Sequence, residues 1–263
     1  MPEDMRIDLK YADLGKLAPG SMIAILGRAK RIGKTTFAKW LTDAQQVPNV
    51  HVMCGGDDEL RSWRATHPGA TVTKPDVDEL DKIRKDQEKL IKADRARFVE
   101  AGGDALDYEI PLALRKWVVF DDTGYKRGFN TSASMVEFAC NHRHLGVDIV
   151  FLMQYFNQIP HMVRDQIDYV GMFRTTNIEI IRKVYDYYVG ADILPTRRAF
   201  HALLEAATQD RGAVLWIDNT DIDSQSVEER LYYARAPCPP SAPDGDDGSR
   251  IEAPHAAGAA STQ

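Results

Sequence analysis

The sequence predicts an α/β fold with a mostly parallel central sheet flanked by helices. Three apolar runs of strand length, residues 22–27, 117–120 and 147–153, are each followed by glycine or polar residues. Buried parallel strands have near-continuous apolar sequences because helices cover both faces of such a sheet. The residues that follow these strands therefore meet at one edge of the sheet, where open α/β folds bind their ligands.

The first apolar run leads into a phosphate-binding loop. Gly33, Lys34 and Thr35 close a turn after the strand at 22–27 and open a helix expected over residues 35–44. Backbone amides and the helix N-terminus of such a loop hold nucleotide phosphates, and its lysine reaches the outer phosphates. The threonine hydroxyl binds Mg²⁺, so we expect ATP or GTP together with Mg²⁺. The residues expected to hold the nucleotide are Gly27, Arg31, Ile32, Gly33, Lys34, Thr35 and Thr36.

The loop departs from the usual spacing. Four residues normally separate its first glycine from the Gly-Lys-Thr sequence, but Gly27 stands one residue further away and Arg28 occupies the glycine position. Either the loop is one residue longer, or it is a variant that begins with a basic residue. Arg28, Lys30 and Arg31 make it strongly positive.

The second apolar run ends in two carboxylates, Asp121 and Asp122. After a phosphate-binding loop, we expect Asp121 to hold Mg²⁺ through water and Asp122 to orient or deprotonate the attacking water. A strand that simply ends in a polar turn is the alternative.

The third apolar run ends in Gln154. A polar side chain at this strand tip, beside the Asp121 strand, is placed to contact the terminal phosphate or the attacking water. The three motifs together predict a RecA-like P-loop NTPase.

The rest of the chain completes this pattern. Residues 76–101 are highly charged, with apolar residues spaced for an amphipathic helix that lies on the sheet or projects from it. We expect a lead-in over 1–20, a nucleotide-binding domain over 21–236 and a disordered tail over 237–263. Further strands are expected over 50–53, 169–173 and 213–217, and further helices over 59–64, 131–144 and 178–189.

Composition agrees with this organisation. No apolar run approaches the ~20 residues that span a bilayer, so we expect no membrane span. Three scattered cysteines, an odd number, favour a reducing compartment over a disulfide framework. The net charge of −6 gives no support for nucleic-acid binding, but a motor needs only a local basic surface. His51 and Cys54 have metal-ligand spacing without a second pair, and we interpret them as ordinary strand residues.

Several segments resemble the genome-packaging ATPases of nucleocytoplasmic large DNA viruses, the poxvirus-type branch of the FtsK/HerA superfamily of P-loop motors. These segments are residues 121–126, 141–144, 154–155, 159–160, 164, 168–170, 215–220 and 232–236. The resemblance covers roughly residues 21–236. It implies a Mg²⁺-dependent ATPase that assembles as a homo-oligomeric ring and translocates double-stranded DNA, regardless of sequence, into a capsid. It also implies a partner at a capsid vertex or portal, and action in the host cell cytoplasm at the virus assembly site, with the virion as a second location.

The resemblance also directs attention to two arginines. In ring motors an arginine from the neighbouring subunit often stabilises the transferring phosphoryl group. Arg143 is the first candidate for this role and Arg164 the second. An ion pair at a helix end is the alternative for each.

Other classes fit part of the pattern. A small P-loop kinase, transferring phosphate to a nucleotide or metabolite, fits the length and the first two motifs, but needs an arginine-rich lid over the phosphates. A GTPase would use residues 121–124 and 73–76, but these motifs occur in the wrong order. A nucleotide-stabilised capsid or scaffold protein would bind without turnover. The residues that argue against it are the intact Lys34, Thr35, Asp121 and Gln154.

Overall fold

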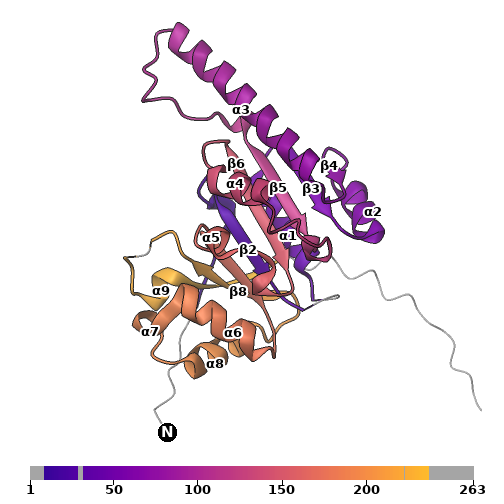
Figure 1. The fold of residues 1–263 in the computed structure, drawn as a ribbon. Helices are drawn as coiled ribbons and strands as arrows, with labels where there is room; N and C mark the ends of the chain where they lie inside the picture. Colours follow the sequence, from indigo (N-terminus) through magenta and orange to yellow (C-terminus); the bar gives the residue numbers. More distant parts are fainter. Residues whose placement is uncertain (1–8, 29–31, 222, 237–263) are drawn as a thin grey trace, which may run out of the picture.

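A nine-stranded sheet forms the centre of the molecule (Figure 1). The computed structural model describes residues 9–28, 32–221 and 223–236. Within them the strand order is β1-β9-β8-β7-β2-β6-β5-β3-β4. The strands are β1 (Lys10–Tyr11), β2 (Met22–Leu26), β3 (Asn49–Cys54), β4 (Thr71–Thr73), β5 (Lys116–Asp121), β6 (Val147–Met153), β7 (Tyr169–Phe173), β8 (Ala213–Asp218) and β9 (Leu231–Arg235).

Helices connect these strands and flank the sheet. The α-helices are α1 (Lys34–Gln45), α2 (Asp57–Thr66), α3 (Val77–Glu100), α4 (Ala133–Asn141), α5 (His161–Arg164), α6 (Ile178–Val184), α7 (Gly190–Ile193), α8 (Arg197–Ala207) and α9 (Val227–Arg230). Short 3-10 turns are η1 (Leu14–Lys16), η2 (Leu112–Leu114), η3 (Thr123–Tyr125) and η4 (Phe156–Gln158), and η5 (Tyr185–Val189) is a π-helical turn.

The strand pairing brings the predicted motifs to one edge of the sheet. Every neighbouring pair is parallel except those of β8, which runs antiparallel to both β7 and β9. β6 lies between β2 and β5. The carboxyl ends of β2, β6 and β5 therefore meet at what we call the carboxyl edge, and the opposite side is the amino edge. This confirms the predicted mostly parallel α/β architecture.

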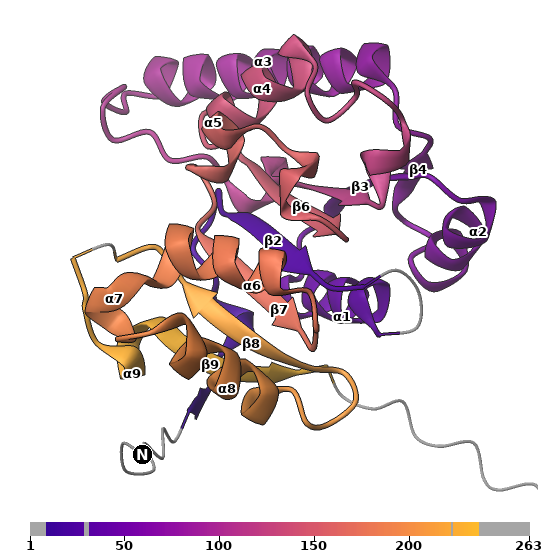
Figure 2. The same cartoon turned by 60° about the horizontal axis from the view of Figure 1, so that its bottom comes forward.

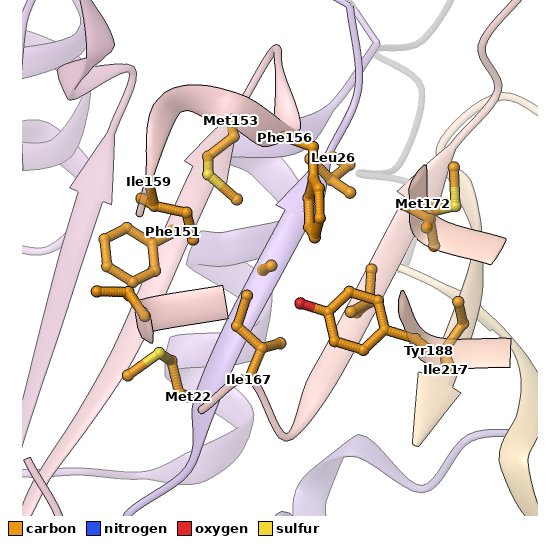
Figure 3. Close-up of a cluster of buried hydrophobic side chains, with 14 of the residues drawn as sticks. Met22, Leu26, Phe151, Met153, Phe156, Ile159, Ile167, Met172, Tyr188 and Ile217 are labelled. Atoms are coloured by element: carbon orange, nitrogen blue, oxygen red, sulfur yellow. The ribbon is translucent and has the colours of Figure 1, made fainter. Parts of the chain in front are cut away.

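Alternating side chains of β2 enter two different hydrophobic cores. Ile23 and Ile25 pack with α1 and α2 on one face. Met22, Ala24 and Leu26 pack on the other face with α3, α4, α5, α6 and α8. Figure 2 shows α1 and α3 on opposite sides of the sheet, and Figure 3 shows Met22 and Leu26 among side chains from β6 and β7. Both faces of the strand that carries the phosphate loop are thus buried.

The charged segment at 76–101 forms one long helix, α3, which both lies on the sheet and projects from it. Leu80 and Ile83 are buried in the core. The Gln87 amide donates to the carbonyls of Leu114 and Leu145, at 2.9 and 3.0 Å. Those carbonyls precede β5 and β6, so α3 has reached the amino edge by this point. Its C-terminal half extends beyond the sheet (Figure 1).

The helix expected over 178–189 changes character along its length: α6 ends at Val184 and continues as the π-helical turn η5. The helix α8, which begins after its N-cap Thr196, was not expected from the sequence. The expected disordered tail at 237–263 lies outside the described residues. Among the residues that are described, no helix has both the length and the apolar character needed to cross a bilayer.

Candidate active site at the carboxyl edge of the sheet

The phosphate-binding loop starts directly after β2 and ends at α1. A Cβ on Gly27 would lie 2.2 Å from Ile32 Cδ1 and 3.1 Å from Phe173 Cβ, so the chain leaves the sheet where a side chain does not fit. Gly33, the N-cap of α1, has a φ of 103°, which favours glycine. Arg31, expected in this loop, lies outside the described residues. The loop therefore uses Gly27 and Gly33 at its two ends.

Lys34, the first residue of α1, points back onto the loop. Its Nζ donates to the carbonyl oxygens of Gly27 and Arg28, at 2.9 and 2.8 Å. Burial lowers the pKa of Lys34, while the charges of Asp122 and Asp121 act in the opposite direction. The ammonium group thus lies beside the loop and within electrostatic range of both carboxylates. Thr36 follows in the first turn of α1 and is exposed.

Asp121, the last residue of β5, is buried and faces α1 and α2. Its Oδ2 accepts hydrogen bonds from Thr35 Oγ1 and from Trp63 Nε1, both at 3.0 Å. Burial raises the pKa of Asp121, and the two hydrogen bonds partly offset that shift. The predicted pair of Thr35 and Asp121 is thus in direct contact. Trp63 is a neighbour that the sequence did not reveal.

Asp122 and Gln154 form a second contact at the same edge. Gln154 Nε2 donates to both carboxylate oxygens of Asp122, at 2.9 and 3.0 Å. Asp122 has a φ of 51° and a ψ of 40°, a left-handed conformation uncommon outside glycine and found mostly in Asn and Asp. Because β6 lies between β2 and β5, Gln154 stands between the phosphate loop and the Asp121 strand.

Gln158, in η4, holds the backbone at the tip of β6. Its Oε1 accepts a hydrogen bond from the Gln154 amide at 3.1 Å. A Cβ on Gly124 would lie 2.1 Å from Gln158 Nε2, so the turn after Asp122 packs directly on this side chain. Gln158 therefore connects the two segments that carry Asp122 and Gln154. Gln158 could not be identified from the sequence, because a polar residue in a loop carries no motif.

Arg143 lies at the amino edge, opposite the phosphate loop. Its Nη2 donates to Asp168 Oδ1 at 2.6 Å, and Asp168 Oδ2 accepts the Met22 amide at 2.8 Å. The ion pair therefore fixes the start of β2. In its own chain Arg143 therefore stabilises the fold through Asp168. Its expected contribution to a neighbouring subunit's site remains a prediction.

Arg164 lies between two aromatic rings. Its guanidinium carbon is 5.2 Å from the centroid of Phe156 and 5.1 Å from that of Tyr187. Its Nε is buried without a hydrogen-bond partner among the described residues. The side chain is held by cation–π contacts, and a role in trans is likewise untested.

The donor atoms at the carboxyl edge fit a magnesium ion. Thr35 Oγ1 and Asp121 Oδ2 are oxygen donors in contact with each other. Mg²⁺ prefers such oxygens and usually keeps several waters while binding one or two carboxylates and substrate phosphates. Within the described residues no group of three or more His, Cys, Asp or Glu side chains forms a metal cage. These observations fit an ion shared between the protein and a bound nucleotide.

His51 and Cys54, on β3, behave as ordinary strand residues. His51 Nε2 lies 2.9 Å from Thr73 Oγ1, and burial lowers the pKa of His51 to about 4. Burial raises the pKa of the Cys54 thiol to about 12, so this thiol is neutral near pH 7. The Cys54 thiol is therefore not prepared to act as a nucleophile.

Comparison with known sequences finds relatives of this chain in iridescent viruses. Protein 075L of Invertebrate iridescent virus 6 is 27% identical over 223 residues, which cover 83% of this chain and 78% of the relative. Protein 088R of Invertebrate iridescent virus 3 is 26% identical over 251 residues, covering 90% and 88%. Residues 76–197, fewer than half of the chain, match the family described as Zonular occludens toxin (Zot).

Comparison with solved structures identifies the fold. The genome packaging NTPase B204 from Sulfolobus turreted icosahedral virus 2, in complex with AMPPCP, matches with a TM-score of 0.51 and 16% identity, over 84% of this chain and 100% of B204. The pCW3 conjugation coupling protein TcpA, with ATPγS, matches with a TM-score of 0.50 and 15% identity, over 86% and 61%. The chain therefore has the P-loop ATPase fold of these structures. The two sequence relatives from iridescent viruses agree with the resemblance to the ATPases of large DNA viruses.

Proposed function

We propose that this chain is a Mg²⁺-dependent ATPase that drives double-stranded viral DNA into a capsid. One observation carries the proposal: two contacting pairs, Thr35 with Asp121 and Asp122 with Gln154, lie at the carboxyl edge beside the phosphate loop. The first pair supplies oxygens for a metal ion, and the second supplies a carboxylate and an amide for a water molecule. This division of roles is what phosphoryl transfer to water requires.

The chemistry follows from the positions of these side chains. Lys34 exchanges its bonds to loop carbonyls for bonds to the outer phosphates. Mg²⁺, when bound beside Thr35 and Asp121, neutralises charge on the phosphates. Asp122 accepts a proton from the attacking water or orients it, and Gln154 holds Asp122 in place. Gln154 also stands where it can report whether the terminal phosphate is present.

A ring is the arrangement that completes this site. Within the described residues, neither Arg143 nor Arg164 contacts the phosphate loop, Asp121 or Asp122 of the same chain. We take the completing arginine from a neighbouring subunit in a homo-oligomer, as in the ring motors that the sequence resembles. Arg143 is our first candidate, because about half of its side chain is exposed despite the ion pair.

The motor is proposed to hold DNA through its phosphates. Phosphate contacts position a protein on the duplex without reading its sequence, which suits a packaging role. The partners are double-stranded DNA, other copies of this chain, and a protein at the capsid vertex or portal. The proposed location is the host cell cytoplasm at the virus assembly site, with the virion as a second location. The viral relatives and the fold shared with packaging NTPase B204 support these proposals.

A small P-loop kinase is less well supported by the structure. It would need a basic lid that closes over the phosphates from the carboxyl edge. The charged helix α3 reaches the amino edge of the sheet at Gln87. From there it extends beyond the sheet, on the side away from the phosphate loop. Gln154 would also have no role in transferring phosphate to an acceptor.

A strand-displacement assay tests the proposed function. A third DNA strand is bound to one end of a linear duplex as a triplex, and its release is followed after addition of the protein and ATP. A motor that moves along the duplex displaces the third strand in an ATP-dependent manner, and Lys34→Ala does not. ATP consumption without displacement, accompanied by phosphate transfer to an added nucleotide, would support the kinase instead.

A further inference from the structure

Trp63 contacts Asp121 but takes no part in the chemistry proposed for the site. It lies in α2 and is fully buried. Its indole Nε1 donates to Asp121 Oδ2 at 3.0 Å, and Thr35 Oγ1 donates to the same oxygen at 3.0 Å. A tryptophan indole is only a donor, so this bond has one possible direction.

The position of α2 explains how Trp63 reaches Asp121. β3 pairs with β5, and Cys54 is the register partner of Asp121. The chain then turns through two glycines, and α2 begins at Asp57. The first two turns of α2 therefore lie beside the carboxyl end of β5, and Leu60 and Trp63 bury its inner face in the same core as α1.

Neighbouring side chains hold the indole in one orientation. The Lys39 ammonium lies 5.2 Å from the centroid of the Trp63 ring and donates to Ser62 Oγ at 2.7 Å. The His67 ring also packs against the Trp63 ring, and the two ring centroids are 5.1 Å apart. The donor is therefore fixed by packing before any ligand binds.

Both hydrogen bonds to Asp121 fall on one oxygen. Trp63 and Thr35 approach Oδ2 from two different helices, α2 and α1, and together they set the plane of the carboxylate. The carboxylate that would hold the metal ion is therefore oriented by one donor from each helix. Donors that orient a metal-binding carboxylate commonly change metal affinity or activity by about 10–100-fold when removed.

We propose that Trp63 is a positioning residue for the magnesium-binding carboxylate: its indole N–H fixes Asp121 for metal binding. This inference rests on the proposed function, because it takes Asp121 as the carboxylate that binds Mg²⁺. It assigns α2 a role in metal binding that the sequence motifs do not reveal.

Trp63→Phe is the first test, since phenylalanine keeps a ring in the core but removes the donor. We expect the Mg²⁺ concentration for half-maximal ATP hydrolysis to rise about 10–100-fold. Turnover at saturating Mg²⁺ should stay within about threefold of the unsubstituted protein, and affinity for a fluorescent ATP analogue in EDTA should be unchanged. Trp216→Phe, the same change at another fully buried tryptophan of this core, should leave all three values unchanged.

A second readout needs no turnover. The chain has four tryptophans, so selective ¹⁵N labelling gives four indole N–H signals, and Trp63→Phe assigns one of them. Mn²⁺ with a non-hydrolysable ATP analogue should broaden the Trp63 signal at lower metal concentration than the Trp216 signal.

The outcomes separate the two proposals. If the protein hydrolyses ATP but Trp63→Phe has an unchanged Mg²⁺ dependence, the positioning role is wrong and the ATPase stands. Equal losses of turnover, ATP affinity and melting temperature in Trp63→Phe would also reject it in favour of simple packing. If Mn²⁺ broadens Trp216 first, the metal does not bind beside Asp121. A protein that neither binds nor hydrolyses ATP would overturn the proposed function itself.

Discussion

Removal of the charge on Asp122 should stop hydrolysis without unfolding the protein or releasing ATP. In Asp122→Asn the side chain keeps one carbonyl oxygen that can accept from Gln154 Nε2, which now donates at 2.9 and 3.0 Å to two oxygens. The fold therefore loses one hydrogen bond to a charged group, worth about 1.5–3 kcal/mol when well formed, and the other bond becomes one between two neutral groups. Asp122 is only partly buried, so the measured loss of stability should lie at the low end.

The expected effect on turnover is much larger. A positioned general base contributes about 10²–10⁴-fold to the rate, which corresponds to about 2.7–5.4 kcal/mol in the activation barrier. Steady-state phosphate release should fall by that factor, while equilibrium binding of a fluorescent ATP analogue stays within about twofold. Asp86→Asn, an exposed aspartate on α3, serves as the matched control. Turnover of Asp122→Asn within threefold of the unsubstituted protein would refute the assignment of Asp122 as the base.

Three further predictions test the loop, a buried histidine and an arginine. Gly33→Ala should lower the free energy of unfolding by about 1–2 kcal/mol, because alanine is strained at a φ of 103°. Its ATP affinity in a binding titration should drop at least tenfold. The control Gly69→Ala, whose new Cβ has no atom within 4 Å, should change neither stability nor affinity. Burial lowers the pKa of His51 from 6.5 to about 4, so the unfolded chain takes up this proton first as the pH falls. The free energy of unfolding should therefore decrease by about 3 kcal/mol more than that of His51→Gln between pH 6.5 and pH 4. Urea denaturation that gives the same loss of unfolding free energy in both proteins over this pH range would contradict this. Arg143→Ala should keep ATP binding but lose most turnover, whereas Asp168→Asn, which breaks the same ion pair, should keep turnover; equal losses in both variants would show that only the ion pair matters.

The central strands were predictable because both of their faces are buried. The expected ranges 147–153 and 169–173 coincide with β6 and β7, since every residue in them is buried and their apolar character stops where the strands stop. The loop and the two carboxylates were predictable for a related reason. Phosphate binding requires glycines, a lysine and a helix N-terminus in a fixed order, and that order is visible in the sequence.

Other parts of the fold depend on tertiary contacts that leave little local signal. β4 has three residues and β1 has two, so their conformation is set by pairing with β3 and β9. The helix α8 was missed although Thr196 caps it and Phe200, Leu203 and Leu204 share one buried face. The helical spacing of this face is therefore present in the sequence.

In the candidate site, too, some residues are predictable from the sequence and others depend on tertiary contacts. Thr35, Asp121, Asp122 and Gln154 come together because the parallel sheet places the ends of β2, β5 and β6 side by side. Trp63 joins them only through the packing of α2 beside β5, and no spacing in the sequence encodes that contact. Whether Arg143 acts on a neighbouring subunit depends on an assembly that the sequence of one chain does not specify.

Steady-state ATP hydrolysis with and without double-stranded DNA tests the central claim most directly. We expect turnover to rise when DNA is added and to be abolished in Lys34→Ala, because the ammonium that contacts Gly27 and Arg28 is the group expected to hold the outer phosphates. Turnover that is indifferent to DNA, or that survives in Lys34→Ala, would contradict a DNA-driven motor built on this phosphate loop.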